Sequence, residues 1–149
     1  MRHLKLWISA VAVVACSTAF ADGGLLGKKK PEFLPVDLAF DLQPLVRKDD
    51  GTLEVSWRIA KDYYLYRDRL KFTAAAPASL KLGKPVLPAS LPYEDEHFGT
   101  MQIYRDKVVV QLPSSTEAKG AVSLTVVYQG CADAGLCYPP QTRTLETGN

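Results

Sequence analysis

Apolar and polar residues alternate with a period of two along much of the chain. The clearest segment runs from Leu53 to Ile59, where every second residue is apolar and the residues between are polar or charged. Strict alternation over four to eight residues is typical of a half-buried β-strand. Further segments with strand-like patterns span residues 38–42, 63–66, 70–72, 108–112 and 122–128. The pattern therefore predicts six to nine short strands, with residues 63–66 and 70–72 as strands or an aromatic-rich extended loop.

Turn-forming residues separate these segments. Asp49-Asp50-Gly51 precedes the strand that starts at Leu53, and Arg105-Asp106 precedes the one at 108–112. Residues 74–92 contain four prolines, so we expect short edge strands broken by loops rather than one long helix. Residues 141–146 are predicted to form a closing edge strand.

The spacing of strands and turns predicts an all-β protein. Short strands at such intervals favour an immunoglobulin-like antiparallel β-sandwich, with a small barrel as the alternative. No window has the period of an amphipathic helix of several turns. Trp57 and Phe72 are expected in the core.

The first 21 residues have the pattern of a secretory signal peptide. A basic start with Arg2 and Lys5 is followed by an apolar run at residues 6–15, which is too short to span a bilayer as a helix. Ala19-Phe20-Ala21 predicts cleavage after Ala21, and export would place the mature protein in an oxidising compartment. Lipidation at Cys16 is the competing interpretation.

The remaining chain is expected to hold a flexible leader at residues 22–32 and one domain at residues 33–149. Removal of residues 1–21 takes away two of the 18 Lys and Arg residues and none of the 16 Asp and Glu residues. A net charge near zero does not support nucleic-acid binding. No later apolar stretch approaches the length of a membrane span, so we expect none in the mature chain.

Two cysteines, Cys131 and Cys137, lie in the predicted mature domain, and an oxidising compartment allows them to pair. Their bond would close a ring of about seven residues, which a chain-entropy argument values at about 2.4 kcal/mol. So short a ring stabilises little, which suits a redox switch, although a static clip in a binding module remains equally open. The five-residue spacer differs from the C-x-x-C of thioredoxin-like sites, and Asp133 within it would disfavour a thiolate.

A metal site is the third possibility that the cysteines leave open. The mature chain has a single histidine, His97, and structural zinc needs four ligands or three and a water. We therefore expect no metal and no cofactor beyond a redox-active disulfide.

Residues 128–140, Tyr-Gln-Gly-Cys-Ala-Asp-Ala-Gly-Leu-Cys-Tyr-Pro-Pro, resemble the active-site hairpin of the DsbD N-terminal domain family, periplasmic thiol:disulfide interchange proteins. Residues 62–67, 94–99 and 103–106 match the same family, and the resemblance covers about residues 33–145. It implies an immunoglobulin-like sandwich with the redox cysteines on a hairpin near one end. The activity it implies is that of a protein-disulfide reductase.

The resemblance also implies partners and roles. Electrons would arrive from the thioredoxin-like donor domain of a membrane reductase and leave to periplasmic disulfide isomerases and a cytochrome c maturation thioredoxin. Cys137 would form the mixed disulfide with these partners, and Cys131 would resolve it. DsbD-type proteins continue into membrane and thioredoxin-like segments, so the sequence ending at Asn149 is either a stand-alone version or a fragment.

In this family a cap loop covers the cysteines, and its counterpart here consists of Asp95, Glu96, His97, Phe98 and Gly99. His97 stands where the family usually has the shielding aromatic, so the resemblance leaves open whether His97 or Phe98 caps the sulfurs. Tyr64 and Tyr66 match family tyrosines beside the cysteine hairpin, where their hydroxyls could bind a sulfur or an acidic cap residue.

A histidine in the cap predicts pH-dependent shielding, because imidazole gains a proton near pH 6.5 and two neighbouring acids favour its charged form. Alkylation of the reduced cysteines between about pH 5 and 8 should follow different pH profiles in the wild type and in His97→Phe. Identical profiles would contradict the hypothesis.

Overall fold

The computed structural model describes residues 32–96, 98–115 and 120–147. The expected signal peptide, nearly all of the expected leader, and His97 lie outside these residues. The helical elements are a four-residue turn, α1 (Val36–Ala39), and a 3-10 turn, η1 (Arg67–Arg69). The strands are β1 (Phe40–Leu42), β2 (Val46–Arg47), β3 (Leu53–Ile59), β4 (Tyr63–Tyr66), β5 (Lys71–Ala76), β6 (Leu91–Asp95), β7 (Gly99–Tyr104), β8 (Lys107–Leu112), β9 (Ser123–Tyr128), β10 (Gly130–Ala132) and β11 (Gln141–Glu146).

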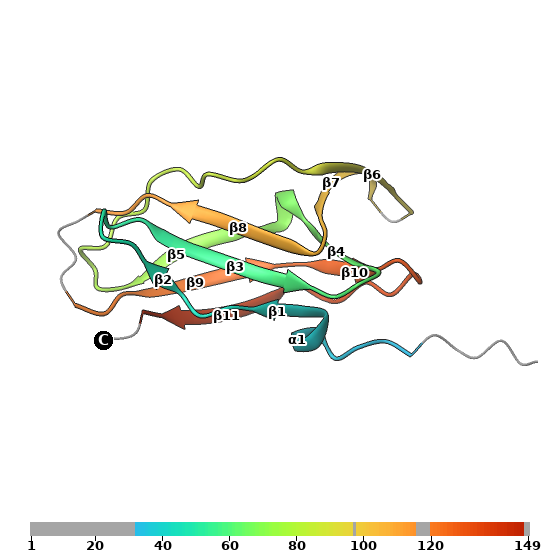
Figure 1. The fold of residues 1–149 in the computed structure, drawn as a ribbon, viewed down its shortest axis with the longest axis horizontal. Coiled ribbons are helices and arrows are strands. Elements are labelled where there is room, and N and C mark those ends of the chain that lie inside the picture. The colour runs from blue at the N-terminus through green and yellow to red at the C-terminus, as the bar shows by residue number, and fades with distance from the viewer. Residues whose placement is uncertain (1–31, 97, 116–119, 148–149) are drawn as a thin grey trace, which may run out of the picture. The chain divides into compact units, whose positions relative to one another are not determined.

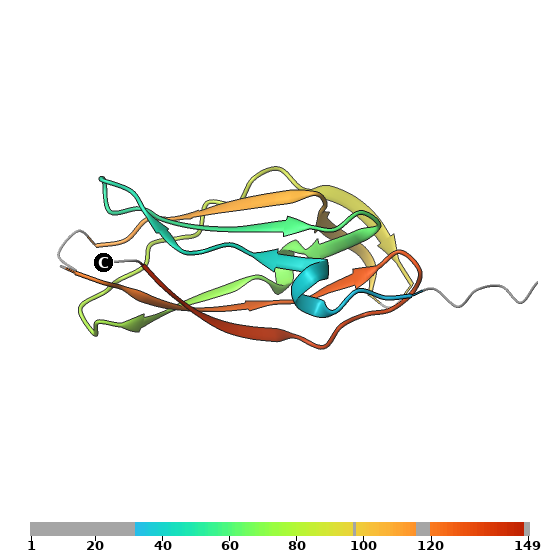
Figure 2. The ribbon, with the colours of Figure 1, turned by 60° about the horizontal axis from the view of Figure 1, so that its bottom comes forward.

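Two sheets face each other across the main core. In the first, β3 pairs with β8 on one side and with β1 and β2 on the other. In the second, β9 lies between β11 and β5. Figure 2 shows β3 and β8 running above β9 and β11. All pairings between these strands are antiparallel, which confirms the predicted sandwich over the barrel.

Alternation along β3 and β9 builds that core. Leu53, Val55, Trp57 and Ile59 are buried on one face of β3, while the residues between them are more exposed. The Trp57 ring meets Tyr128 of β9 edge-on, with 5.6 Å between ring centroids. Burial of each large apolar side chain contributes about 1.5–3 kcal/mol. Phe72 was expected in the core, and it packs against Trp57 from a half-buried position at the margin.

A third sheet, in the order β10-β4-β7-β6, lies near the end of β3 at Ile59 (Figure 1). Its strand β4 is buried on both faces. Tyr63 and Leu65 face the main core, whereas Tyr64 and Tyr66 belong to a second cluster with Ile103 and Cys131. β4 therefore connects the scaffold to the cysteines.

The predicted strand at residues 38–42 is wrong in its first half. Residues Val36–Ala39 form the helical turn α1, and only Phe40–Leu42 is extended. Pro35 begins the turn, because its carbonyl oxygen accepts the N–H groups of Leu38 and Ala39 at 2.9 Å each. Leu38 is consequently 64% exposed rather than facing the core.

The other segments predicted as strands are confirmed, including the closing strand at residues 141–146. The predicted number of six to nine strands is too low, because the described residues contain eleven, and strands as short as the two-residue β2 show no alternation. Residues 74–92 contain the end of β5, isolated bridges at Leu82 and Val86, and the start of β6, as the prolines predicted. In the part of the chain that the structure describes, no helix is long and apolar enough to cross a membrane.

Gly130, the residue before Cys131, is closely enclosed. A Cβ atom at this position would overlap the carbonyl oxygen of Tyr64 and the ring of Phe40. We predict that Gly130→Ala lowers the free energy of unfolding by about 3 kcal/mol, because neither backbone nor core ring can give way cheaply. Denaturant unfolding measures this.

Gly83→Ala is the matched control, because its Cβ would approach mainly the Pro113 side chain, at 3.2 Å. This variant should change the unfolding free energy by about 0.5 kcal/mol or less. Equal effects of the two substitutions would contradict the close packing at Gly130.

Candidate redox site

The two cysteines lie at opposite sides of one tight hairpin. β10 carries Cys131 and pairs with β4, with Cys131 opposite Tyr64. The chain then turns, and Cys137 returns to form an isolated antiparallel bridge with Cys131. Gly135 permits the turn, because its φ of 94° lies in the region that disfavours other residues. The Ala132 N–H donates to the Leu136 carbonyl at 2.8 Å and closes the loop.

Cys131 and Cys137 form a disulfide, with 4.0 Å between their Cα atoms. The environments of the two residues differ. Cys131 is completely buried in the second cluster, whereas Cys137 is half-buried and lines a surface cleft. A partner can therefore approach the Cys137 sulfur more readily than the Cys131 sulfur.

Two tyrosines and one carboxylate surround the buried sulfur. Tyr64 and Tyr66 both donate hydrogen bonds to Asp95 Oδ2, at 2.8 and 2.5 Å. The Tyr66 oxygen also lies 3.0 Å from Cys131 Sγ and 3.9 Å from Cys137 Sγ. Burial and the bond to Asp95 raise the pKa of both tyrosines well above the ordinary value. Both hydroxyls are therefore neutral at physiological pH.

A hydroxyl has one hydrogen, so Tyr66 contacts Cys131 through oxygen lone pairs when it donates to Asp95. In the reduced protein the Cys131 thiol can therefore donate to Tyr66. The sequence anticipated both tyrosines near a sulfur or an acidic cap residue, and the structure brings Tyr66 to both at once.

The expected cap loop joins β6 to β7. Asp95, at the end of β6, is buried, and its Oδ1 accepts the Phe98 N–H at 3.0 Å. The Phe98 ring packs edge-on against Tyr66, with 5.4 Å between centroids, and Arg69 of η1 lies 5.1 Å from the Phe98 ring centre. Gly99 begins β7 with a φ of 73°. Phe98 thus covers the tyrosine that contacts the sulfurs, and the choice between His97 and Phe98 as cap remains a prediction.

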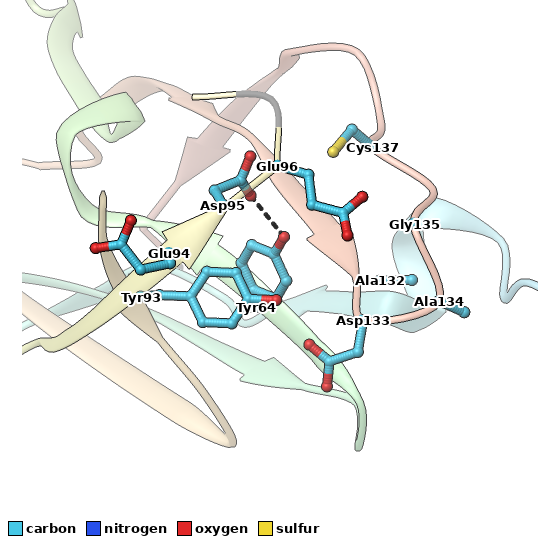
Figure 3. A pocket seen from close by; sticks show the side chains of 10 residues that line it. All are labelled: Tyr64, Tyr93, Glu94, Asp95, Glu96, Ala132, Asp133, Ala134, Gly135 and Cys137. Carbon is cyan, nitrogen blue, oxygen red and sulfur yellow. Dashed lines mark hydrogen bonds between the residues drawn. The ribbon is translucent and has the colours of Figure 1, made fainter. Parts of the chain in front are cut away.

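A cleft of about 260 Å³ opens between β6 and the cysteine loop (Figure 3). Acidic side chains from both sides line it, and Tyr64 and Tyr93 pack against each other in its wall with 4.8 Å between ring centroids. The lining residues are Tyr64, Tyr93, Glu94, Asp95, Glu96, Ala132, Asp133, Ala134, Gly135 and Cys137.

Asp133 was expected to oppose thiolate formation as an acidic neighbour of the cysteines. Its carboxylate is instead paired with Arg105, which donates from Nη2 to Oδ1 at 2.8 Å and from Nη1 to Oδ2 at 3.0 Å. In Figure 3 the Asp133 side chain lies at the opposite end of the loop from Cys137. The guanidinium therefore offsets the negative charge of Asp133.

Several residues of the site were not singled out from the sequence. Arg105 belongs to a block that matches the family, and this match was the signal that could have identified it. Tyr138, directly after Cys137, donates to the Leu34 carbonyl at 2.5 Å, and Leu34 N–H donates to the Tyr63 hydroxyl at 2.8 Å. The start of the domain is thereby attached to the cysteine hairpin.

Within the described residues no group of three or more His, Cys, Asp or Glu side chains is arranged to bind a metal ion. His97, the one histidine of the predicted mature chain, lies outside those residues.

Removal of the Tyr66 hydroxyl should destabilise the domain in a pH-dependent way. Tyr66→Phe deprives buried Asp95 of one donor, which should cost about 1.5–3 kcal/mol near neutral pH. The folded protein keeps the Tyr66 proton above pH 10, while the unfolded chain loses it. This stabilisation is complete below about pH 10 and falls as pH rises further. The difference in unfolding free energy between wild type and variant should therefore narrow above about pH 10.

Urea unfolding of both proteins at neutral and alkaline pH measures that gap. Tyr93→Phe is the control, because the Tyr93 ring packs on Tyr64 in the same cleft. It should lower the free energy of unfolding at neutral pH by much less than Tyr66→Phe does. A Tyr66→Phe gap that stays constant with pH would contradict the assignment.

Comparison with known proteins shows which family this chain resembles. The family model described as "Thiol:disulfide interchange protein DsbD, N-terminal" matches residues 30–149. The DsbD protein of Cronobacter sakazakii is 41% identical over 141 residues, covering 93% of this chain and 23% of that protein. DsbD 2 of Pseudomonas aeruginosa is 43% identical over 122 residues, covering 82% and 19%. The chain thus spans about a fifth of the length of these relatives.

Two solved structures are also similar. The reduced DsbD N-terminal domain of Neisseria meningitidis matches with a TM-score of 0.69 and 35% identity, covering 78% of this chain and 91% of that one. The DsbD N-terminal domain in complex with the PilB N-terminal domain, from the same organism, matches with a TM-score of 0.65 and 31% identity. This match covers 80% of this chain and 91% of that one. These matches confirm the immunoglobulin-like fold and the resemblance to the DsbD N-terminal domain family. The chain belongs to the family of DsbD N-terminal domains.

Proposed function

We propose that this domain is a protein-disulfide reductase module whose Cys131–Cys137 bond opens and closes as electrons pass through it. The observation that supports this most directly is the asymmetry of the bonded pair, in which one sulfur is buried and the other lines a cleft. A ring this small adds little to stability, so the bond can change state while the sandwich stays folded.

The chemistry is thiol–disulfide exchange. A donor thiolate attacks Cys137 Sγ, the Cys131–Cys137 bond breaks, and Cys131 leaves as a thiolate that takes up a proton. A second donor thiolate then attacks the donor sulfur of the mixed disulfide and releases Cys137 as a thiol. The donor ends as a disulfide, and two electrons and two protons have passed to the pair. With an acceptor disulfide the same steps run in reverse.

The different exposure of the two sulfurs supports the division of roles. Cys137 forms the mixed disulfide, because it lines the cleft that a partner enters. Cys131 resolves it from the buried side, where the Tyr66 hydroxyl keeps the sulfur in place 3.0 Å away. Resolution needs no movement of the sheet, because Cys131 lies on the paired strand β10.

The cap loop and the tyrosines protect the pair between exchanges. Phe98 lies on Tyr66, and buried Asp95 ties the end of β6 to both tyrosine hydroxyls. Glu96 lines the cleft beside Cys137, and Gly99 supplies the bend at the start of β7. A partner that displaces Phe98 would uncover Tyr66, which contacts the buried Cys131 sulfur, whereas the Cys137 sulfur is reached through the cleft.

Partners and location follow from the family. A relative was solved in complex with a PilB N-terminal domain, which supports docking of a protein partner on this domain. The donor is the thioredoxin-like domain of a membrane reductase, and the acceptors are periplasmic disulfide isomerases and a cytochrome c maturation thioredoxin. Export through the segment at residues 1–21 and cleavage after Ala21 would place the domain in the periplasm.

Removal of the resolving cysteine tests this function. Cys131→Ala should accumulate a mixed disulfide when its Cys137 thiolate attacks the disulfide of an oxidised thioredoxin-like partner and releases one partner thiol, because Cys131 is no longer present to break the new bond and release the partner as a dithiol. Cys137→Ala is the matched control and should trap at least ten times less, because its remaining sulfur is buried. Non-reducing gels and mass spectrometry identify the adduct.

Failure of the wild-type bond to exchange with any thioredoxin-like donor would favour the alternative, a non-catalytic binding module with a structural clip. Equal trapping by the two variants would instead contradict the division of roles.

A further inference from the structure

The loop between the cysteines is tied to a neighbouring turn by one arginine. Arg105 lies in the β7–β8 turn, and its guanidinium forms two parallel hydrogen bonds with the Asp133 carboxylate, at 2.8 and 3.0 Å. Asp133 also donates its backbone N–H to the Asp62 carbonyl at 2.8 Å. Both contacts of Asp133 therefore join the cysteine loop to segments outside the hairpin, at Arg105 and at Asp62.

The same guanidinium packs on two aromatic rings. It lies 5.2 Å from the Tyr64 ring centre and 5.5 Å from that of Tyr93, and Nη1 approaches the Tyr63 carbonyl oxygen at 3.4 Å. Arg105 thus contacts β4, the cap strand β6 and the cysteine loop at once. A planar group with fixed donors suits such a position, since lysine offers a single point charge without the fork.

We propose that Arg105 is a positioning residue for the cysteine pair. By fixing Asp133, it keeps the loop closed after the disulfide has been reduced, so that the two sulfurs remain close enough to bond again. The proposal deepens the function above, because it presumes that the bond opens and closes in use. Isolated surface ion pairs contribute little, but this pair has two bonds, a stacked geometry and side chains that are 28% and 37% exposed.

Loss of the contact should favour the dithiol over the disulfide. The disulfide holds its own ring closed, so the clamp matters most when that bond is open. A reduced loop without the clamp samples more conformations, and freeing about one residue of backbone changes an equilibrium constant by roughly tenfold. The Cys131–Cys137 couple should therefore become more oxidising.

The test is a redox titration of the folded domain in mixtures of reduced and oxidised dithiothreitol. In this reaction one dithiothreitol molecule reduces one protein disulfide to two thiols and becomes a cyclic disulfide. Arg105→Gln and Asp133→Asn should each lower the equilibrium constant for disulfide formation five- to tenfold, and tenfold is about 30 mV for a two-electron couple. Arg105→Lys should also have a lower equilibrium constant than the wild type, because lysine keeps the positive charge but lacks the two parallel donors of the guanidinium.

Adding Arg105→Gln to Asp133→Asn should change the constant less than twofold further, if the arginine acts through this carboxylate. Asp133→Asn changes one exposed loop residue and keeps its size, so it tests the proposal even if Arg105→Gln fails to fold.

Arg143→Gln is the matched control. Arg143 of β11 forms an ion pair with Asp37 of α1 at 2.7 Å, and neither residue lines the cysteine cleft. This variant lowers stability in both redox states alike and should leave the constant within twofold of the wild type. The proposal is overturned if the equilibrium constant for disulfide formation in Asp133→Asn stays within twofold of the wild-type value. It is also overturned if Arg143→Gln lowers this constant as much as Asp133→Asn does.

Exchange of the wild type with a thioredoxin-like donor, measured alongside, separates this proposal from the function. Absence of exchange contradicts the function, whereas the dithiothreitol equilibrium reports on Arg105 independently of any partner.

Discussion

The burial of β4 on both faces governs the arrangement of this domain. Most strands in the sandwich have one face toward the core and one toward solvent, so their apolar residues alternate with polar ones. In β4 every residue is buried, with Tyr63 and Leu65 packed into the main core and Tyr64 and Tyr66 into the cysteine cluster. The redox site is therefore built on a strand that the scaffold already immobilises.

Pairing between β4 and β10 transmits that rigidity to the sulfur. Cys131 lies opposite Tyr64 in the register, and Gly130 lies opposite Leu65 with no space for a side chain. Tyr66 then reaches the Cys131 sulfur and the Asp95 carboxylate together. Because side chains alternate along a strand, a shift of one residue in this register would turn Cys131 away from the tyrosines.

The site combines a fixed half with a half that partners can reach. Cys131, Tyr64 and Tyr66 lie on paired strands, whereas Cys137 and the loop before it depend on local hydrogen bonds and on the Arg105–Asp133 contact. A local disulfide between these halves can change redox state without loss of the core. Tyrosine is suited to the boundary, because its ring fills apolar space while its hydroxyl binds a polar group.

Much of the fold could be read from alternation alone. Residues 53–59 became a strand as predicted, because their period of two places one face on the core. The prediction failed at Leu38, where the carbonyl of Pro35 binds two following N–H groups and starts a helical turn. Local apolar periodicity carries no information about such a backbone contact.

The sequence by itself determined most of the strands, the family and the pair Cys131 and Cys137, because each depends on residue types at short spacing. Only the tertiary structure decided that Asp133 is paired with Arg105, that Tyr66 contacts both Asp95 and a sulfur, and that the two cysteines differ in exposure. These contacts join residues 28 to 65 positions apart. Their geometry arises from strand register and sheet packing, which no local pattern encodes.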